Sequence, residues 1–262
     1  MDTKRLITFE EYSKIKHDTP YFYALGSGEQ KIYYFGERHS RDPQDTEWQQ
    51  AKTFWLEFLK DTPNSKRIVF VEGNKSPIMN TLEEAIRKYG GPGFITFLAS
   101  ESNIDIHCPE PERTYEINEL AYKFSKEEIA YYYFARSANG WNRMREPKPE
   151  FEKYISQSLK KNETESRWSD FDFSLENMKN VHKKLFGNEF DQNNSDFFKD
   201  IVSPVKSEAK INKIARSCSN IRNEYMVKEI QKYWGMSYSI YIHYGVGHAV
   251  MQEPALRNLE NK

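Results

Sequence analysis

The sequence predicts an α/β fold in which a mainly parallel central sheet is flanked by helices. Before about residue 110, short runs rich in aromatic and β-branched residues alternate with segments of helical periodicity. One run, residues 67–71, is continuously apolar, as is typical of a strand buried on both faces of a parallel sheet. Later in the chain helical periodicity takes over, which predicts a helical insertion or cap at approximately 117–206 within a single domain of residues 1–262.

The N-terminal part predicts a hairpin followed by a helix. Two aromatic-rich runs, residues 22–25 and 31–35, are separated by Gly26-Ser27-Gly28, which suits a turn between two strands. Asp45 is the expected N-cap of the helix that follows. Apolar residues recur after it at three- and four-residue steps, so we expect this helix to cover the sheet: Trp48, Ala51, Trp55, Leu56 and Leu59.

The predicted strand at residues 67–71 is followed by further alternation. A helix is expected at about 81–89, a second short helix ends near residue 100, and a strand is expected at 103–107. This order of elements supports a sheet with helices on its faces.

The remaining part of the chain predicts helices until the last strand. Four helical segments are expected, near residues 126–136, 149–160, 175–186 and 196–201. Residues 160–170 are polar enough to predict a mobile loop. A long amphipathic helix is expected at about 207–234, and a strand at 238–244 follows it.

Composition excludes several classes of protein. The chain has 38 Lys and Arg residues and 39 Asp and Glu residues. The charge is therefore nearly balanced, and there is no excess of basic residues that would predict a nucleic-acid partner. The charged start Met1–Arg5 lacks the apolar core of a signal peptide, and no apolar run is long enough to span a membrane. Cys108 and Cys218 are far apart and outside any CxxC pattern, which predicts reduced thiols. We therefore expect a cytoplasmic protein, whose oligomeric state the sequence leaves open.

Two short segments near opposite ends of the chain have the same form. Gly36-Glu37-Arg38-His39 ends one strand-like run, and Gly245-Val246-Gly247-His248 ends another. Both imidazoles are expected where strands end and loops begin, at the carboxyl edge where open α/β sheets bind ligands. Histidine is suited to proton transfer near neutral pH and to binding transition metals, so the pair predicts a functional site.

Carboxylates follow several predicted strands. Glu72 comes directly after the apolar run 67–71, and a carboxylate buried there requires a charged, hydrogen-bonding or metal partner. Glu37, Glu110 and Glu112 also follow predicted strands. Carboxylates and imidazoles suit a divalent cation, and without a metal Glu or His can act as a general base on water.

The other histidines are weaker candidates. His17 lies in a polar segment and His182 follows a charged helical pattern, so both are expected to be solvated. His107 and His243 lie inside strand-like runs, which predicts core residues or residues that support a site. No GxSxG or HExxH motif is present, so neither a serine-hydrolase nor a zincin mechanism is indicated.

Four landmarks follow one another along the chain: the GERH segment at 36–39, Glu72, the segment Arg222-Asn223-Glu224-Tyr225-Met226, and the GVGH segment at 245–248. In this order they resemble the pattern of the superfamily of erythromycin esterase-like, ChaN-like and Tiki/TraB proteins. The resemblance covers almost the whole chain. Tiki members are metal-dependent proteases, whereas the esterase branch activates water with the Glu and His of the first motif without an obligatory metal.

The resemblance implies a hydrolase of peptide or ester bonds that acts on a small-molecule or peptide substrate. Its implied catalytic residues are Glu37, His39, Glu72, Arg222 and His248. His39 or Glu37 would be the general base, Arg222 would stabilise the oxyanion, and His248 would orient substrate, carry a proton or bind metal.

The resemblance also implies two kinds of cofactor. A divalent metal (Mn, Co or Zn) would be held by His39, Glu72 and His248, and haem is the alternative. A haem- or metal-binding ChaN-like module without turnover is therefore the rival of the hydrolase. An interaction protein that has lost activity is a third hypothesis, which the intact cluster of candidate residues disfavours.

Overall fold

The computed structural model describes residues 6–206 and 208–259. Two sequence-based predictions concern positions outside these ranges. The charged start Met1–Arg5, on which the signal-peptide prediction depends, lies outside the described residues, as does Ser207, the expected first residue of the long helix.

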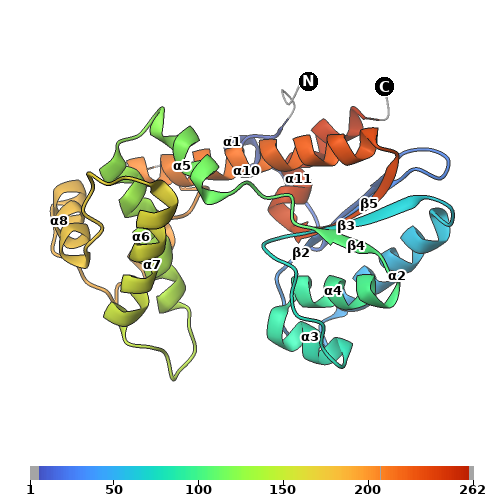
Figure 1. The fold of residues 1–262 in the computed structure, drawn as a ribbon, viewed down its shortest axis with the longest axis horizontal. Coiled ribbons are helices and arrows are strands. Elements are labelled where there is room, and N and C mark those ends of the chain that lie inside the picture. Colours follow the sequence, from blue (N-terminus) through green and yellow to red (C-terminus); the bar gives the residue numbers. More distant parts are fainter. Residues whose placement is uncertain (1–5, 207, 260–262) are drawn as a thin grey trace. The chain divides into compact units, whose positions relative to one another are not determined.

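The chain forms two compact units. The first, here the sheet unit, comprises residues 1–110 and 223–262, and the second, here the helical unit, comprises residues 111–222 (Figure 1). The helical unit begins and ends outside the expected bounds 117–206. The single-domain organisation stays a prediction.

The sheet unit contains a five-stranded mixed sheet that is mostly parallel, which confirms the predicted α/β class. Its strands are β1 (Tyr21–Leu25), β2 (Ile32–Glu37), β3 (Lys66–Val71), β4 (Asp105–His107) and β5 (Tyr238–Gly245). Their order in the sheet is β1-β2-β5-β3-β4. β1 is antiparallel to β2, as the glycine turn predicted, and all other neighbours are parallel.

The last strand of the chain is the middle strand of the sheet. β5 pairs with β2 on one side and with β3 on the other. Its register places Glu37 opposite Gly245 and Val71 opposite His243. Since these three strands run in the same direction, their carboxyl ends lie side by side at one edge of the sheet.

Helices cover both faces of this sheet (Figure 1). One face packs against α2 (Thr46–Asp61), α3 (Leu82–Tyr89) and α4 (Gly91–Glu101). The other face packs against residues 226–230 of α10 (Lys210–Gly235) and against α11 (Val246–Arg257). The short helix α1 (Phe9–Tyr12) contacts α11. α11 was not predicted, because Gly247 and Pro254, which both lie inside it, are poor helix formers.

Helix α2 confirms the predicted N-cap and corrects the predicted apolar stripe. The Asp45 side chain accepts a hydrogen bond from the amide of Glu47. Leu56, expected against the sheet, is 55% exposed, whereas Phe58 is fully buried. The buried face of α2 passes through Ala51, Trp55 and Phe58, so Leu56 lies just outside it.

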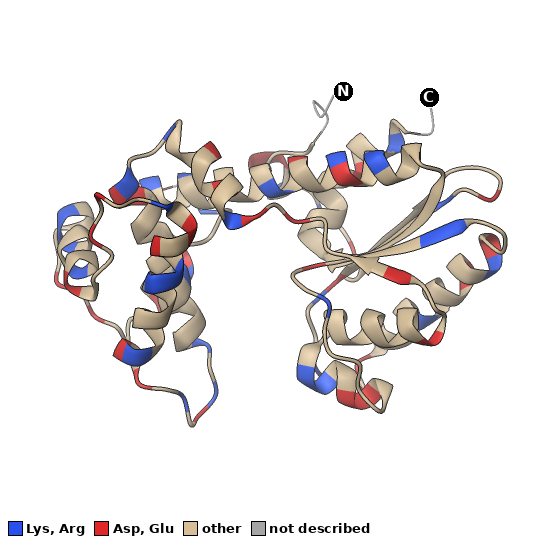
Figure 2. Ribbon diagram, viewed as in Figure 1, with Lys and Arg blue, Asp and Glu red and all other residues tan. Residues whose placement is uncertain are grey.

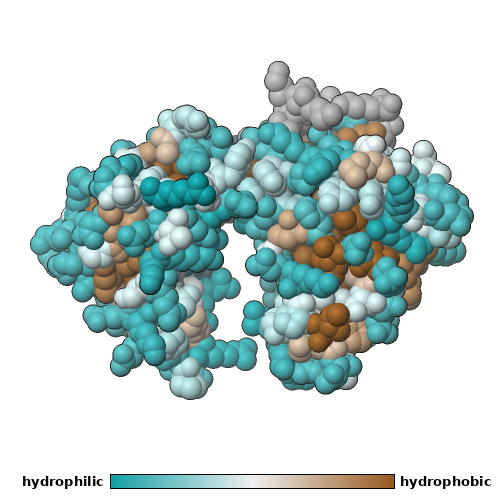
Figure 3. All heavy atoms as spheres, in the orientation of Figure 1, coloured by the Kyte–Doolittle hydropathy of each residue, from teal (hydrophilic) through white to brown (hydrophobic). Residues whose placement is uncertain are grey.

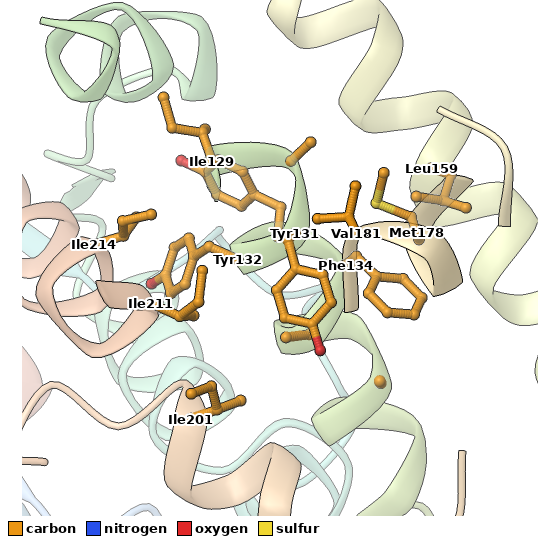
Figure 4. Packing of buried hydrophobic residues seen from close by; sticks show 14 of the residues in the cluster. Ile129, Tyr131, Tyr132, Phe134, Leu159, Met178, Val181, Ile201, Ile211 and Ile214 are labelled. Atoms are coloured by element: carbon orange, nitrogen blue, oxygen red, sulfur yellow. The ribbon is translucent and has the colours of Figure 1, made fainter. Parts of the chain in front are cut away.

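The helical unit has a core of its own. It consists of α5 (Arg113–Ala121), α6 (Lys126–Asn142), α7 (Phe151–Ser166), α8 (Leu175–Phe186), α9 (Ser195–Ile201) and the first part of α10. Tyr131 and Phe134 from α6 lie among aliphatic side chains of the neighbouring helices (Figure 4). The aromatic run of α6 therefore serves packing, as its composition predicted.

Two expectations for the helical unit are wrong. Residues 160–166 are not a loop, because α7 continues to Ser166 and buries Asn162 and Ser166. His182 is only 2% exposed although lysines follow it, because its face of α8 turns inward. Its Nδ1 lies 2.7 Å from the Tyr131 hydroxyl, and burial lowers the pKa of its imidazole.

The surface carries mixed charge. Lys and Arg are interspersed with Asp and Glu on the helices of each unit (Figure 2). On the face drawn in Figure 3, hydrophilic residues cover most of each unit, and apolar residues gather in smaller areas. Among the described residues, no helix is both long and apolar enough to cross a membrane.

The packing of α2 gives a first prediction. Phe58→Ala removes a fully buried ring between the helix and the sheet, so we expect it to lower the free energy of unfolding by about 3–5 kcal/mol. Leu56→Ala, two residues away on the exposed side, is the matched control and should change it by about 0.5 kcal/mol or less. Urea unfolding of the two variants measures both values, and equal effects would contradict this orientation of the helix.

Candidate active site

Three strand ends bring the candidate residues together. Glu37 is the last residue of β2, Glu72 follows β3, and Gly245 ends β5. His39 lies two residues beyond β2 in the loop that leads to α2. Because the three strands are parallel neighbours, Glu37, His39 and Glu72 meet at one edge, as the sequence predicted.

Glu37 is a buried carboxylate with both oxygens engaged. It is 1% exposed. Its Oε1 lies 2.9 Å from Nδ1 of His39, and its Oε2 lies 3.1 Å from Nε2 of His243. Burial alone would raise its pKa, but the hydrogen bonds and charges of His243 and His39 outweigh that effect and lower the pKa to about 2. Glu37 is therefore ionised at neutral pH.

His39 presents its other nitrogen to a pocket. Its side chain is 59% exposed, and its Nε2 lies 3.9 Å from Oε2 of Glu72. The hydrogen bond to Glu37 raises the pKa of His39, burial opposes this, and the negative charges of Glu37, Glu72 and Glu47 raise it further. The imidazole is thus a stronger base than an ordinary histidine. We call Glu37 and His39 the dyad.

The backbone of His39 is held in an unusual conformation. Its φ is +62°, a left-handed region that is uncommon for residues other than glycine. The residues on either side of His39 are bound by the fully buried carboxylate of Glu47. It accepts hydrogen bonds from the backbone amide of Arg38 at 3.0 Å and from that of Ser40 at 3.2 Å. Glu47 was missed by the sequence analysis, since a glutamate in the first turn of a helix is common.

Glu72 has the partner that its position required. Its Oε2 accepts a hydrogen bond from the amide of Gly245 at 2.9 Å, at the N-terminus of α11. The positive end of the helix dipole stabilises a carboxylate there. Glu110, a further strand-end candidate, accepts a hydrogen bond from the amide of Gly73 at 3.1 Å. Glu112 belongs to the helical unit, where it precedes α5.

Two glycines allow the functional groups to approach the backbone. A Cβ on Gly245 would lie 2.6 Å from Nε2 of His39, and a Cβ on Gly91 would lie 2.1 Å from Oε2 of Glu37. Neither position has room for a side chain. The first glycine of the GVGH motif is therefore needed because His39 packs directly against it.

A pocket of about 230 Å³ opens beside the dyad. It lies wholly within the sheet unit. Its lining consists of Glu37, His39, Arg41, Glu72, Tyr89, Gly90, Gly91 and Pro92. This volume is below the roughly 300–1,000 Å³ of most small-molecule sites, so it suits a small reacting group.

His248 occupies a different setting from the one expected. It lies in the first turn of α11 and not in a loop. Its Nδ1 is 2.7 Å from Oδ1 of Asn223, which also accepts a hydrogen bond from Gln252 at 2.8 Å. Gln252 in turn accepts one from the Tyr34 hydroxyl at 3.0 Å. Asn223 thus orients His248 as Glu37 orients His39.

The resemblance implies a divalent metal beside the dyad. A catalytic zinc usually has three protein ligands. Among the described residues, no three His, Cys, Asp or Glu side chains are arranged to hold one ion. His39 and Glu72 offer two, while both oxygens of Glu37 are engaged by histidines. The predicted ligand set of His39, Glu72 and His248 is therefore not seen as one group among the described residues, and metal binding stays a prediction.

Arg222 is the last residue of the helical unit. Its role as an oxyanion stabiliser stays a prediction from the resemblance.

The dyad makes stability depend on pH. Because the pKa of Glu37 is lowered, its ionised carboxylate stabilises the fold at pH values above 4.5, the ordinary pKa of glutamate. This contribution is lost as the pH falls toward 2. The raised pKa of His39 acts oppositely: its contribution is present below 6.5 and is lost as the pH rises through the folded pKa. We expect the free energy of unfolding of wild type to exceed that of Glu37→Gln most between pH 4.5 and 6.5. As the pH falls toward 2, this difference in the free energy of unfolding should shrink by about 3 kcal/mol.

Urea unfolding of both proteins across pH 2–8 measures this difference. A difference that does not change with pH would show that Glu37 is not held ionised by the two histidines.

The chain was compared with protein-family models, with curated proteins and with solved structures, and no match was found. The superfamily resemblance consequently remains a prediction.

Proposed function

We propose that the chain is a hydrolase in which His39 activates water for attack on a peptide or ester carbonyl. The observation that carries this proposal is the dyad itself: a buried, ionised carboxylate accepts the Nδ1 proton of an imidazole whose Nε2 borders an open pocket. A carboxylate in this relation to histidine fixes the tautomer and stabilises the imidazolium formed during catalysis.

His39 is favoured over Glu37 as the general base. Glu37 is buried, both of its oxygens accept hydrogen bonds, and its lowered pKa makes it a weak base. His39 is half-exposed, and the raised pKa of its imidazole suits proton transfer near neutral pH. Of the two alternatives that the sequence left open, the geometry therefore supports the histidine.

The proposed reaction moves one proton through Nε2 of His39. This nitrogen takes a proton from water as the oxygen bonds to the carbonyl carbon, giving a tetrahedral intermediate. The imidazolium then lies between the carboxylates of Glu37 and Glu72, whose charges stabilise it. It returns the proton to the leaving oxygen or nitrogen as that bond breaks, which regenerates neutral His39 and releases the acid.

The resemblance supplies the roles that complete this proposal. It assigns stabilisation of the oxyanion to Arg222 and substrate orientation to His248. The peptide or ester class of bond also comes from it. The proposed steps are assigned to side chains of the protein alone, and the need for a metal is tested by chelation.

A panel of peptide and ester substrates tests the proposal, with His39→Gln as the informative variant. Loss of the Nε2 base should lower kcat/KM by about 100- to 10,000-fold, while the protein should remain folded because the ring is half-exposed and the Gln amide can still donate a hydrogen bond. His17→Gln is the matched control, since His17 lies in the segment before β1 and hydrogen-bonds to Asp18 and Tyr12. Unchanged turnover in His39→Gln would remove the histidine from the mechanism.

The same panel is repeated after chelation, together with elemental analysis and an absorption spectrum. We expect turnover to survive chelation. Loss of turnover with about one equivalent of metal would restore the metal-dependent hydrolase. Bound haem without turnover would favour the carrier.

The pH dependence of kcat/KM gives a further prediction. The base must be unprotonated, so activity should rise with pH through the pKa of His39 in the free enzyme. Because Glu37 raises that pKa, the midpoint of the rise should lie above 6.5. A midpoint near 4 would instead identify a carboxylate as the base.

A further inference from the structure

A second histidine contacts the dyad from inside the protein. His243 lies in the middle strand β5, and its side chain is fully buried. Its Nε2 is 3.1 Å from Oε2 of Glu37, the oxygen that does not contact His39. The three side chains therefore form a chain from the core to the pocket, in the order His243, Glu37, His39.

The inner end of this chain is enclosed by aromatic rings. The His243 ring stacks on Phe35 with centroids 5.4 Å apart and on Trp48 at 6.3 Å, and Phe94 lies 5.5 Å away. Its Nδ1 is buried and has no hydrogen-bond partner among the described residues. An unpaired buried polar atom costs about 1–3 kcal/mol.

That cost indicates what the histidine does. The neighbouring strand positions Tyr241 and Ile242 are buried in apolar clusters, and an apolar residue at 243 would leave no unpaired nitrogen. An apolar residue would also leave the buried Oε2 of Glu37 without a donor. The gain from histidine at this position is therefore its Nε2–H contact with Glu37.

The surroundings also fix where the proton of His243 lies. Nδ1 has no hydrogen-bond partner among the described residues, whereas Nε2 faces a carboxylate that accepts hydrogen bonds. Neutral His243 must therefore carry its proton on Nε2. Since no acceptor lies beyond Nδ1 among the described residues, the chain has no inner exit for a proton. It can orient the dyad but cannot conduct protons away from it.

We propose that His243 is a positioning residue of the dyad. Its Nε2–H donates a hydrogen bond to Oε2 of Glu37 and so holds the carboxylate in place. Oε1 of Glu37 then accepts a hydrogen bond from Nδ1–H of His39, which leaves Nε2 of His39 unprotonated toward the pocket. This inference rests on the proposed function for its catalytic meaning, but the orientation of His39 can be measured without a substrate.

Two pairs of variants separate positioning from packing. His243→Phe keeps the stacked ring and removes the donor. His243→Gln places an amide N–H where Nε2 lies, whereas His243→Asn has a shorter side chain whose amide falls near Nδ1 and cannot reach Glu37. The Gln and Asn pair remains informative if the Phe variant does not fold. His107→Phe, on the edge strand β4, is the control for loss of a strand histidine elsewhere.

The first readout is the tautomer of His39, measured by ¹⁵N NMR of histidine-labelled protein at a pH where the ring is neutral. In wild type, His243→Gln and His107→Phe we expect the proton of His39 on Nδ1. In His243→Phe and His243→Asn we expect a mixture of tautomers, because the Glu37 carboxylate is no longer held. The second readout is steady-state kinetics, in which the Phe and Asn variants should lose about 10- to 100-fold in kcat with little change in KM.

Two results would overturn the proposal. An unchanged His39 tautomer in folded His243→Phe or His243→Asn would make His243 a packing residue only, and so would equal loss of kcat in the Gln and Asn variants. If no substrate is turned over by wild type, the proposed function fails, yet the NMR measurement still decides whether His243 positions His39.

Discussion

A buried carboxylate kept ionised at the end of a strand is the constraint on which the candidate site depends. Glu37 is removed from water, so it stays charged only because His243 and His39 each donate a hydrogen bond to it. Several features of the surroundings follow from this need. Gly91 lacks a side chain because the Glu37 carboxylate fills that space, and Glu47 holds the loop that places His39 against Glu37.

The sheet order makes this site a product of the complete fold. β5 is the last strand in the sequence, yet it lies between β2 and β3 and supplies His243 and Gly245. Until β5 is in place, Glu37 lacks one donor and Glu72 lacks the amide of Gly245. Contacts so distant in sequence form only with tertiary structure, so the integrity of the central sheet and the chemistry of the dyad are coupled.

The helical unit differs from the sheet unit in the chemistry that its core can support. Its buried thiol, Cys218, lies 2.7 Å from Oε1 of Glu116, and burial together with that negative charge raises the pKa of Cys218 to about 12. A thiol with such a pKa is a poor nucleophile at neutral pH. Aromatic and aliphatic packing dominates this core, whereas the dyad and its pocket belong to the sheet unit.

The sequence alone determined the fold class, most element positions and the candidates Glu37, His39 and Glu72, because buried strands and amphipathic helices leave periodic patterns. Local pattern could not reveal which face of α2 packs, so Leu56 was misplaced. It also could not reveal that His182 is buried or that His248 lies in the first turn of a helix. The role of Glu47 was hidden because a glutamate at this position is ordinary in a helix. The contact of His243 with Glu37 was hidden because the two residues are far apart in the chain. Only tertiary structure decides such contacts, since they depend on how the chain folds back to bring the partners together.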